Sequence, residues 1–213
     1  MSVEVDKSLH KVIIIQMRYI VGIDEAGRGP LAGPVAVGVV KVNKLKKFNK
    51  LVKGIKDSKK LSEAKREEWF EKLHEVEPRV KTKFAVYLIS EKIIDKHGIA
   101  YAIRLGIKKC LIKLKVSDNS KIFLDGGIKA PENFLHQTTI IKGDEKIPVI
   151  SLASICAKVT RDRFMIKLSK KYPQYNFHIH KGYGTLMHRK LIKKHGPSPA
   201  HRKSFLKNFK RKS

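Results

Sequence analysis

Three short apolar runs in this sequence each lead into an aspartate, and this repeated pattern restricts the chain to few folds. The aspartates are Asp24 after residues 20–23, Asp125 after residues 122–124 and Asp144 after residues 140–143. Short apolar runs that stop at a polar turn are typical of buried strands. Because α/β sheets build their sites in the loops beyond strand ends, we expect the three carboxylates to converge at one edge of a sheet.

The other periodicities in the sequence alternate strands with helices. Apolar spacing predicts strands over residues 19–24, 34–42, 80–89, 121–125 and 138–142. Helical spacing predicts helices that begin at Ser62, run over 98–115, run over 151–170, and run from a Thr185 N-cap to Ile192 before Gly196 and Pro197. A hairpin followed by alternating helices and strands predicts an α/β fold, with a mixed sheet covered by helices.

The chain is strongly basic, with 47 Lys and Arg against 19 Asp and Glu and a formal net charge of +28. The last acidic residue is Asp162, so every later charged side chain apart from histidine is a base. This balance favours a polyanionic partner such as a nucleic acid. Lysine bias, or adaptation to a salty or hot cell, is the alternative. An apolar content of 42% excludes a disordered polycation.

Cysteine usage and hydropathy exclude several classes of protein. Cys110 and Cys156 are the only cysteines and form no CxxC pair, which supports neither a zinc site nor a disulfide framework. The early apolar run at 12–15 is too short for a signal peptide or a membrane span. We therefore expect a soluble, cytoplasmic protein with no membrane partner.

Glu25 adds a fourth carboxylate beside Asp24. Four converging carboxylates make a negative pocket that repels phosphate unless hard divalent cations such as Mg²⁺ or Mn²⁺ fill it. Two such ions about 3.5–4 Å apart activate a water and stabilise the leaving oxygen in phosphodiester hydrolysis. The alternative is that these acids are ordinary turn formers at strand ends.

A glycine-rich segment with a single arginine, Gly27-Arg28-Gly29-Pro30, follows the first two acids directly. Glycine lets backbone N–H groups approach a ligand closely, and Arg28 offers a planar fork of donors for phosphate. Such a loop beside a metal site is suited to contact a sugar-phosphate backbone and its 2′-hydroxyl. A plain tight turn is the alternative.

Residues 22–35, GIDEAGRGPLAGPV, resemble the opening motif of the type 2 ribonucleases H, the ribonuclease HII family. Five later blocks are similar to the family's other motifs and come in the same order, so the resemblance covers about residues 19–205. These blocks are DSKKLS at 57–62, FLDG at 123–126, KGD at 142–144 with SLASICAKVTRDR at 151–163, KGYGT at 181–185 and HRKSF at 201–205.

The resemblance implies a ribonuclease H-like fold: a central five-stranded mixed sheet flanked by helices, with a helical C-terminal extension. It implies a metal-dependent endonuclease that hydrolyses the RNA strand of RNA–DNA hybrids and cuts 5′ of ribonucleotides embedded in duplex DNA. The products carry 3′-hydroxyl and 5′-phosphate ends, and the activity removes ribonucleotides in DNA replication and repair. The implied partners are these two nucleic acids, and the implied cofactors are two Mg²⁺ or Mn²⁺ ions.

The resemblance also assigns roles to individual residues. Asp24, Glu25, Asp125 and Asp144 hold the metals and form the catalytic set. Gly27, Arg28 and Gly29 read the 2′-hydroxyl, Tyr183 stacks on the sugar of the following deoxynucleotide, and Lys59 meets a DNA phosphate. The implied organisation is a monomer with a leader over 1–17, one catalytic domain over 18–205 (core 18–165, helical part 166–205) and a basic tail over 206–213.

The chain departs from the family pattern at Gly98, where the family usually has an asparagine, and its leader has no counterpart. Neither departure affects the four carboxylates. Two alternative functions remain open at this stage. One is a non-catalytic nucleic-acid-binding protein, and the other is a different nuclease or integrase-like enzyme of the same fold. The glycine–arginine–glycine loop distinguishes the ribonuclease from this second alternative, because an enzyme acting only on DNA has no 2′-hydroxyl to recognise.

Several other chemically suggestive residues are assigned ordinary roles. We expect the histidines at 178, 180 and 201 to lie on the surface or face phosphate, because no partner stands at zinc-ligand spacing. Asp162, which is flanked by arginines, is expected to form an ion pair within its helix. The remaining expectations are that Asp57 holds its loop, and that Trp69 and Cys156 pack in the interior.

Overall fold

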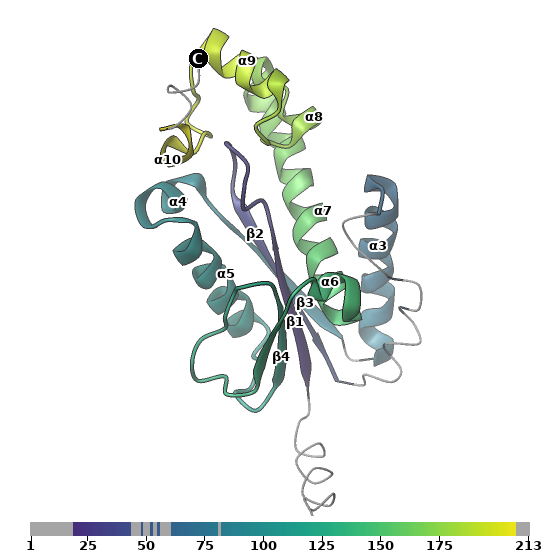
Figure 1. Cartoon of the computed structure of the whole chain (residues 1–213). Coiled ribbons are helices and arrows are strands. Elements are labelled where there is room, and N and C mark those ends of the chain that lie inside the picture. Colours follow the sequence, from purple (N-terminus) through teal and green to yellow (C-terminus); the bar gives the residue numbers. More distant parts are fainter. Residues whose placement is uncertain are drawn as a thin grey trace, which may run out of the picture.

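The computed structural model describes residues 19–43, 48, 52, 55, 61–80 and 82–207. The expected leader over 1–17, Asp57 and Lys59 lie outside the described residues, as does most of the expected tail. The described chain forms a five-stranded sheet in the order β3-β2-β1-β4-β5, with helices on both faces (Figure 1). The strands are β1 Ile20–Ala26, β2 Val35–Val42, β3 Lys83–Ile89, β4 Lys121–Asp125 and β5 Gln137–Ile140.

The sheet is mixed, as expected. Strand β2 pairs antiparallel with both β1 and β3, while β4 is parallel to β1 and to β5. All eight residues of β2 are buried. A strand covered on both faces reads as a continuous apolar run instead of an alternating one, which explains the valine-rich sequence VAVGVVKV.

The helices follow the predicted periodicity, with several short additions. The helices are α3 Glu63–Val80, α4 Glu91–His97, α5 Ile99–Lys113, α6 Gly143–Lys146, α7 Pro148–Lys171, α8 Phe177–His180, α9 Leu186–His195 and α10 Lys203–Leu206, with the 3₁₀ turn η1 at Pro173–Tyr175. Thr185 caps α9 as predicted, because its Oγ1 accepts a 3.3 Å hydrogen bond from the His188 N–H. The short helices α4, α6, α8 and α10 were not expected from the sequence.

Two apolar cores lie on opposite faces of the sheet. On one face α5 packs Ile103, Ile107 and Cys110 against β2 and β3. On the other face α7 and α3 form the second core, which includes Cys156 and, partly buried, Trp69. The prediction that these two residues pack in the interior is confirmed.

Helix α7 lies unusually close to the central strands because two positions facing it lack a side chain. A Cβ atom on Gly22 of β1 would lie 2.3 Å from the Val149 carbonyl oxygen, and one on Gly38 of β2 would lie 2.2 Å from that of Ala153. The small residues of the SLASICA segment therefore serve a tight helix–sheet contact. This contact fixes α7 against the strand that carries Asp24.

The C-terminal part of the chain packs beside the loop that joins β1 to β2. A third cluster joins Ala32 of that loop to Met165 of α7, Phe177 of α8 and Ile192 of α9. Figure 1 shows α7 rising from the sheet toward α8 and α9, which lie near the end of the β1–β2 hairpin. The described residues include no helix long and apolar enough to cross a membrane.

Candidate active site

Strands β1 and β4 bring Asp24 and Asp125 to the same edge of the sheet. Ile23 pairs with Leu124 in parallel register, so the two aspartates are the next residues on neighbouring strands. Residues in register on parallel strands point to the same face. On β1 this is also the face on which Gly22 contacts α7. We call Asp24, Glu25, Asp125 and Asp144 together the carboxylate edge.

Asp24 is the most strongly perturbed member of this set and has only 3% of its surface exposed. Its Oδ1 accepts a 2.7 Å hydrogen bond from the Glu25 backbone N–H. Its Oδ2 is buried without a hydrogen-bond partner in the described part of the chain. The pKa of Asp24 is raised to about 8, first by burial and then by the negative charges of Glu25 and Asp125, while the Ser154 hydroxyl lowers it in part. A bound cation would relieve this excess of negative charge.

Asp144 approaches Asp125 by a route that differs from the prediction. Strand β5 ends at Ile140, so Asp144 lies in helix α6 and not directly beyond a strand over 138–142. The backbone turns at Lys142 with a left-handed φ of 54°. The next N–H, that of Gly143, donates a 2.7 Å hydrogen bond to Asp125 Oδ1. This bond ties Gly143 to Asp125 and so fixes the position of the next residue, the fully buried Asp144.

The donor chemistry of the carboxylate edge suits a hard divalent cation, because Mg²⁺ and Mn²⁺ prefer carboxylate oxygens. The buried Oδ2 of Asp24 supplies one oxygen that no described protein group occupies. Within the described ranges, however, no three His, Cys, Asp or Glu side chains already stand close enough together to hold a metal ion. Ligation by all four carboxylates therefore requires their side chains to converge further.

The loop between β1 and β2 places the predicted glycines and Arg28 next to the carboxylate edge. Gly27 has a φ of +89°, and a Cβ atom there would lie 2.0 Å from Arg161 Nε, so no other residue fits. Arg28 and Gly29 are exposed. The Nη1 of Arg28 lies 3.5 Å from Glu25 Oε1. The loop thus presents its arginine to solvent beside the acids.

Two buried arginines, Arg161 of α7 and Arg202, hold this loop by hydrogen bonds to its backbone carbonyls, and we call them the arginine clamp. Each is 0% exposed. Arg161 donates to the carbonyls of Pro34 at 2.9 Å, Ala32 at 3.2 Å and Lys181 at 3.0 Å. Arg202 donates to the carbonyls of Gly33 at 2.9 Å, Arg28 at 3.0 Å and Gly27 at 2.7 Å.

The arginine clamp escapes sequence analysis because both residues stand among many other bases. The available signal was the choice of arginine in a lysine-rich chain, since only a guanidinium presents donors on three nitrogen atoms in one plane. Burial, followed by the positive charge of Arg161, lowers the pKa of Arg202 to about 9. The hydrogen bonds to backbone carbonyls compensate the cost of burial, and five of the six fix the course of residues 27–34.

A cavity of about 330 Å³ joins the loop to the predicted stacking residue Tyr183. Tyr183 is 40% exposed. The lining residues are Glu25, Ala26, Gly27, Arg28, Gly29, Arg66, Ser154, Lys158 and Tyr183. Arg66, Ser154 and Lys158 are additional candidates for substrate contact. A larger cavity of about 950 Å³ lies against α5 and shares Arg28 with the first.

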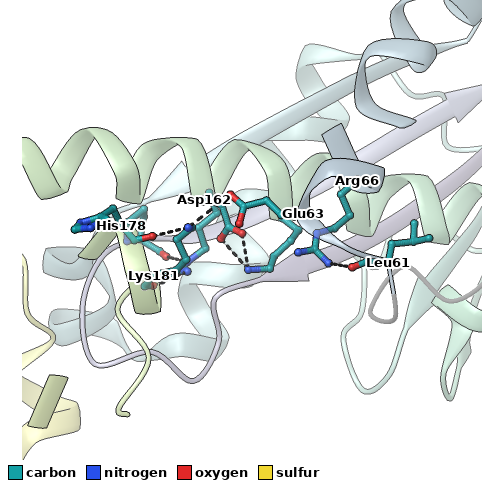
Figure 2. Close-up of polar contacts among 9 residues, drawn as sticks. Leu61, Glu63, Arg66, Asp162, His178 and Lys181 are labelled. Atoms are coloured by element: carbon teal, nitrogen blue, oxygen red, sulfur yellow. Dashed lines mark hydrogen bonds and ion pairs between the residues drawn. The ribbon is translucent and has the colours of Figure 1, made fainter. Parts of the chain in front are cut away.

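One ion pair connects the start of α3 to the segment that precedes Tyr183, and another lies within α7. Lys181 Nζ lies 3.6 Å from Glu63 Oε1 and donates a 2.7 Å hydrogen bond to the His178 carbonyl, as Figure 2 shows. Asp162 pairs with Lys158, whose Nζ lies 2.7 and 2.8 Å from its two carboxylate oxygens. The predicted intrahelical ion pair of Asp162 is therefore confirmed, with Lys158 as its partner and not a flanking arginine.

The prediction for the histidines is correct only for His178, which is exposed and has Nδ1 2.9 Å from Ser169 Oγ. His180 and His201 are 7% and 1% exposed, so the expected surface position is wrong for both. They pack against Phe177 in the third cluster. The burial comes from segments that are distant in the sequence, which single-sequence spacing cannot reveal.

Comparison with known proteins decides the family. The Ribonuclease HII family profile matches residues 21–211. The Ribonuclease HII of Caldicellulosiruptor bescii is 43% identical over 192 residues, which is 90% of this chain and 88% of that protein. The chain belongs to the ribonuclease HII family. It is an enzyme of the ribonuclease H class, an endonuclease and a hydrolase.

Solved structures agree with this ribonuclease HII assignment. The ribonuclease H2 of Pyrococcus horikoshii has a TM-score of 0.67 and 29% identity, and the match covers 92% of this chain and all of that one. The Bst ribonuclease HIII, solved in complex with Mn²⁺, shares the fold with a TM-score of 0.59 at 16% identity, covering 96% of this chain and 70% of that one. The expected ribonuclease H-like fold is confirmed.

Proposed function

We propose that this enzyme hydrolyses the RNA strand of RNA–DNA hybrids and cuts on the 5′ side of ribonucleotides embedded in duplex DNA. The products would carry 3′-hydroxyl and 5′-phosphate ends. The observation that carries the proposal is the buried, unpartnered Oδ2 of Asp24 beside Asp125, next to a loop that only glycine can form at position 27. Membership of the ribonuclease HII family supports it.

Asp24, Glu25, Asp125 and Asp144 are the proposed ligands of two divalent ions, Mg²⁺ or Mn²⁺. When bound, the ions supply Lewis-acid activation of water and charge stabilisation at the 3′ oxygen. The chain's own contribution is a rigid pair of strands that fixes Asp24 and Asp125, and a hydrogen bond that fixes Gly143 before Asp144. Asp24 gives up its proton when a cation occupies the site, because ligands bind deprotonated.

Gly27, Arg28 and Gly29 are the proposed contacts to the ribonucleotide. The exposed guanidinium of Arg28 offers paired donors to a phosphate, and the glycines let a 2′-hydroxyl approach the backbone closely. Tyr183, across the same cavity, is proposed to stack on the sugar of the following deoxynucleotide. The proposal includes a DNA phosphate contact for Lys59, which lies outside the described residues.

The excess of basic residues supplies affinity for the duplex without supplying sequence preference. The enzyme is proposed to act as a cytoplasmic monomer that removes ribonucleotides during DNA replication and repair. Its substrates are then RNA–DNA hybrids and duplex DNA that contains ribonucleotides, and their phosphates explain why a net charge of +28 is useful.

The test is a cleavage assay on duplex DNA that contains one ribonucleotide, with Mg²⁺ or Mn²⁺ and with EDTA. The expected result is one cut on the 5′ side of the ribonucleotide with either metal, a 5′-phosphate on the downstream fragment, and none in EDTA. An all-DNA duplex of the same sequence is the matched control and stays intact. An uncut ribonucleotide strand with both metals contradicts the proposal, and cleavage of the all-DNA duplex contradicts the role of the 2′-hydroxyl.

A further inference from the structure

A chain of hydrogen bonds through two buried histidines ends on the backbone of Tyr183. The Ser198 N–H lies 2.9 Å from His201 Nδ1. His201 Nε2 lies 3.1 Å from His188 Nε2, and His188 Nδ1 lies 2.9 Å from the Tyr183 carbonyl oxygen. Both histidine side chains are almost inaccessible, with exposures of 0% for His188 and 1% for His201.

The end points of this chain determine where each proton sits. Because a backbone N–H can only donate, His201 Nδ1 accepts from Ser198, and the proton of neutral His201 is on Nε2. That Nε2–H donates to His188 Nε2, so the proton of His188 is on Nδ1. The Nδ1–H of His188 then donates to the Tyr183 carbonyl, a backbone acceptor. Every bond in the chain is satisfied when both rings are neutral.

His180 holds the residue before Tyr183 in the same way. Its Nδ1 accepts from the Gly182 N–H at 3.2 Å, and its Nε2 donates to the Tyr175 carbonyl at 2.8 Å. Its ring stacks on that of His188, with 4.2 Å between centroids and 19° between planes. The turn at Gly182, where φ is +84°, is therefore fixed from both sides.

We propose that His188 and His201 are positioning residues that aim the Tyr183 ring at the substrate through the Tyr183 carbonyl. The inference rests on the stacking role given to Tyr183 under the proposed function. Tyr183 is 40% exposed, and Lys158 Nζ and Arg161 Cζ lie 5.8 and 5.7 Å from the centroid of its ring. Its direction therefore depends on the backbone that carries it, which the histidine chain holds.

The surroundings keep both rings neutral. The pKa of His188 and that of His201 are each lowered to about 4, chiefly by burial and to a smaller extent by the charge of His180. The titratable groups next to this pair are His180 of α8 and Tyr175 of η1. Lys181 and His178 act in turn on His180, and Arg202 follows His201 directly in the chain. Protonation of either ring would place two N–H donors opposite each other and break the chain.

The test measures junction selectivity, which is kcat/KM for duplex DNA with one ribonucleotide divided by kcat/KM for a uniform RNA–DNA hybrid. His188→Phe keeps the ring and removes both nitrogens, and we expect a loss of selectivity of about tenfold, the equivalent of one hydrogen bond. Tyr183→Ala is expected to lose at least as much. The double variant should match Tyr183→Ala, because the chain acts only through Tyr183.

Three comparisons separate positioning from general damage to the fold. His188→Asn retains a donor near the Nδ1 position and should recover most of the selectivity. The exposed His178→Gln should equal the wild type. In the wild type, selectivity should fall as the pH drops toward 4, whereas in His188→Phe it should not change, and the ratio cancels the titration of the carboxylates common to both substrates.

Unchanged selectivity in His188→Phe, or a further loss when it is added to Tyr183→Ala, overturns the positioning role. If Tyr183→Ala itself retains the selectivity of the wild type, the stacking role in the proposed function is wrong, which is a separate result. Should His188→Phe fail to fold, ¹⁵N NMR of the wild-type histidines decides instead. Protons on His188 Nδ1 and His201 Nε2 support the chain, and the opposite tautomers refute it.

Discussion

The carboxylate edge and the arginine clamp both bury charge, but they compensate it in opposite ways. At the carboxylate edge, Asp24 keeps a buried oxygen without a described partner, and its neighbours are charges of the same sign. In the arginine clamp, every one of the six guanidinium nitrogens of Arg161 and Arg202 donates to a backbone carbonyl. The first region leaves a buried carboxylate oxygen without a described hydrogen-bond partner, whereas in the second every guanidinium nitrogen has one.

This difference separates the part of the molecule that we propose performs the chemistry from the part that holds the surrounding backbone in place. A buried charge with all its hydrogen bonds made stabilises one conformation. A buried carboxylate with a raised pKa costs stability that a bound cation restores. The histidine chain belongs with the arginine clamp, because its ring nitrogens also all have hydrogen-bond partners, and both hold backbone that carries the side chains proposed to contact the substrate.

The largest expected effect comes from breaking the arginine clamp. Arg202→Met removes three hydrogen bonds and leaves the carbonyls of Gly27, Arg28 and Gly33 buried without that donor. We expect the free energy of unfolding in urea to fall by about 4 kcal/mol. Arg163→Met is the matched control, since this arginine is half-exposed and pairs with Glu67 and Glu71. It should change stability by less than about 1 kcal/mol. Equal losses of stability in the two variants would contradict the claim that the buried arginine stabilises the fold more than the half-exposed one.

A smaller effect of opposite sign is expected at the carboxylate edge. Asp24→Asn keeps the shape but cannot ionise in the unfolded chain, so in EDTA at pH 7.5 it should raise the free energy of unfolding by about 2 kcal/mol. Because the folded pKa of about 8 lies above the unfolded value of 3.8, the penalty in the wild type grows as the pH rises from 3.8 to 8. The gain should therefore be larger at pH 7.5 than at pH 5. A destabilised variant in EDTA contradicts this account of the site.

The smallest effect is the acid sensitivity of the histidine chain. His188 and His201 have folded pKa values of about 4 against an unfolded value of 6.5, so they cost nothing above pH 6.5. Stability is lost as the pH falls from 6.5 to 4, because the unfolded chain takes up protons that the folded chain refuses. Between pH 7.5 and 5.5 each histidine contributes a loss of about 1 kcal/mol. In His201→Gln, the free energy of unfolding in urea should therefore fall by about 1 kcal/mol less than in the wild type over this pH range. An equal fall in the two proteins would contradict the lowered pKa of His201.

Sequence reasoning was most successful where local pattern determines structure. The apolar runs before Asp24 and Asp125 predict two strands that reach the same edge, and the parallel register of β1 and β4 agrees. The same reasoning was wrong about the route to Asp144. The left-handed Lys142 and the hydrogen bond from Gly143 to Asp125 end β5 early, and both depend on a contact between distant segments.

Apart from the short helices, the features that sequence reasoning missed depend on contacts between distant segments. His180 and His201 are neutral and buried because α8, α9 and the segment around Ser198 fold around Phe177. The arginine clamp joins positions 161 and 202 to a loop more than 120 residues away, as the separations of 127 and 169 residues to Pro34 and Gly33 show. In a chain with 47 basic residues, the choice of arginine over lysine is the one local signal, and it does not separate these two from the other arginines.

The most direct test of the carboxylate edge is single-turnover cleavage of a duplex with one ribonucleotide by Asp24→Asn, with the dissociation constant measured on the same substrate. Cleavage should fall at least about 10³-fold, in the range seen when a transition-state contact is removed. Affinity should stay within about threefold, because backbone electrostatics dominate binding. Cleavage within tenfold of the wild-type rate, at unchanged affinity, would contradict the claim that Asp24 is part of the catalytic metal site.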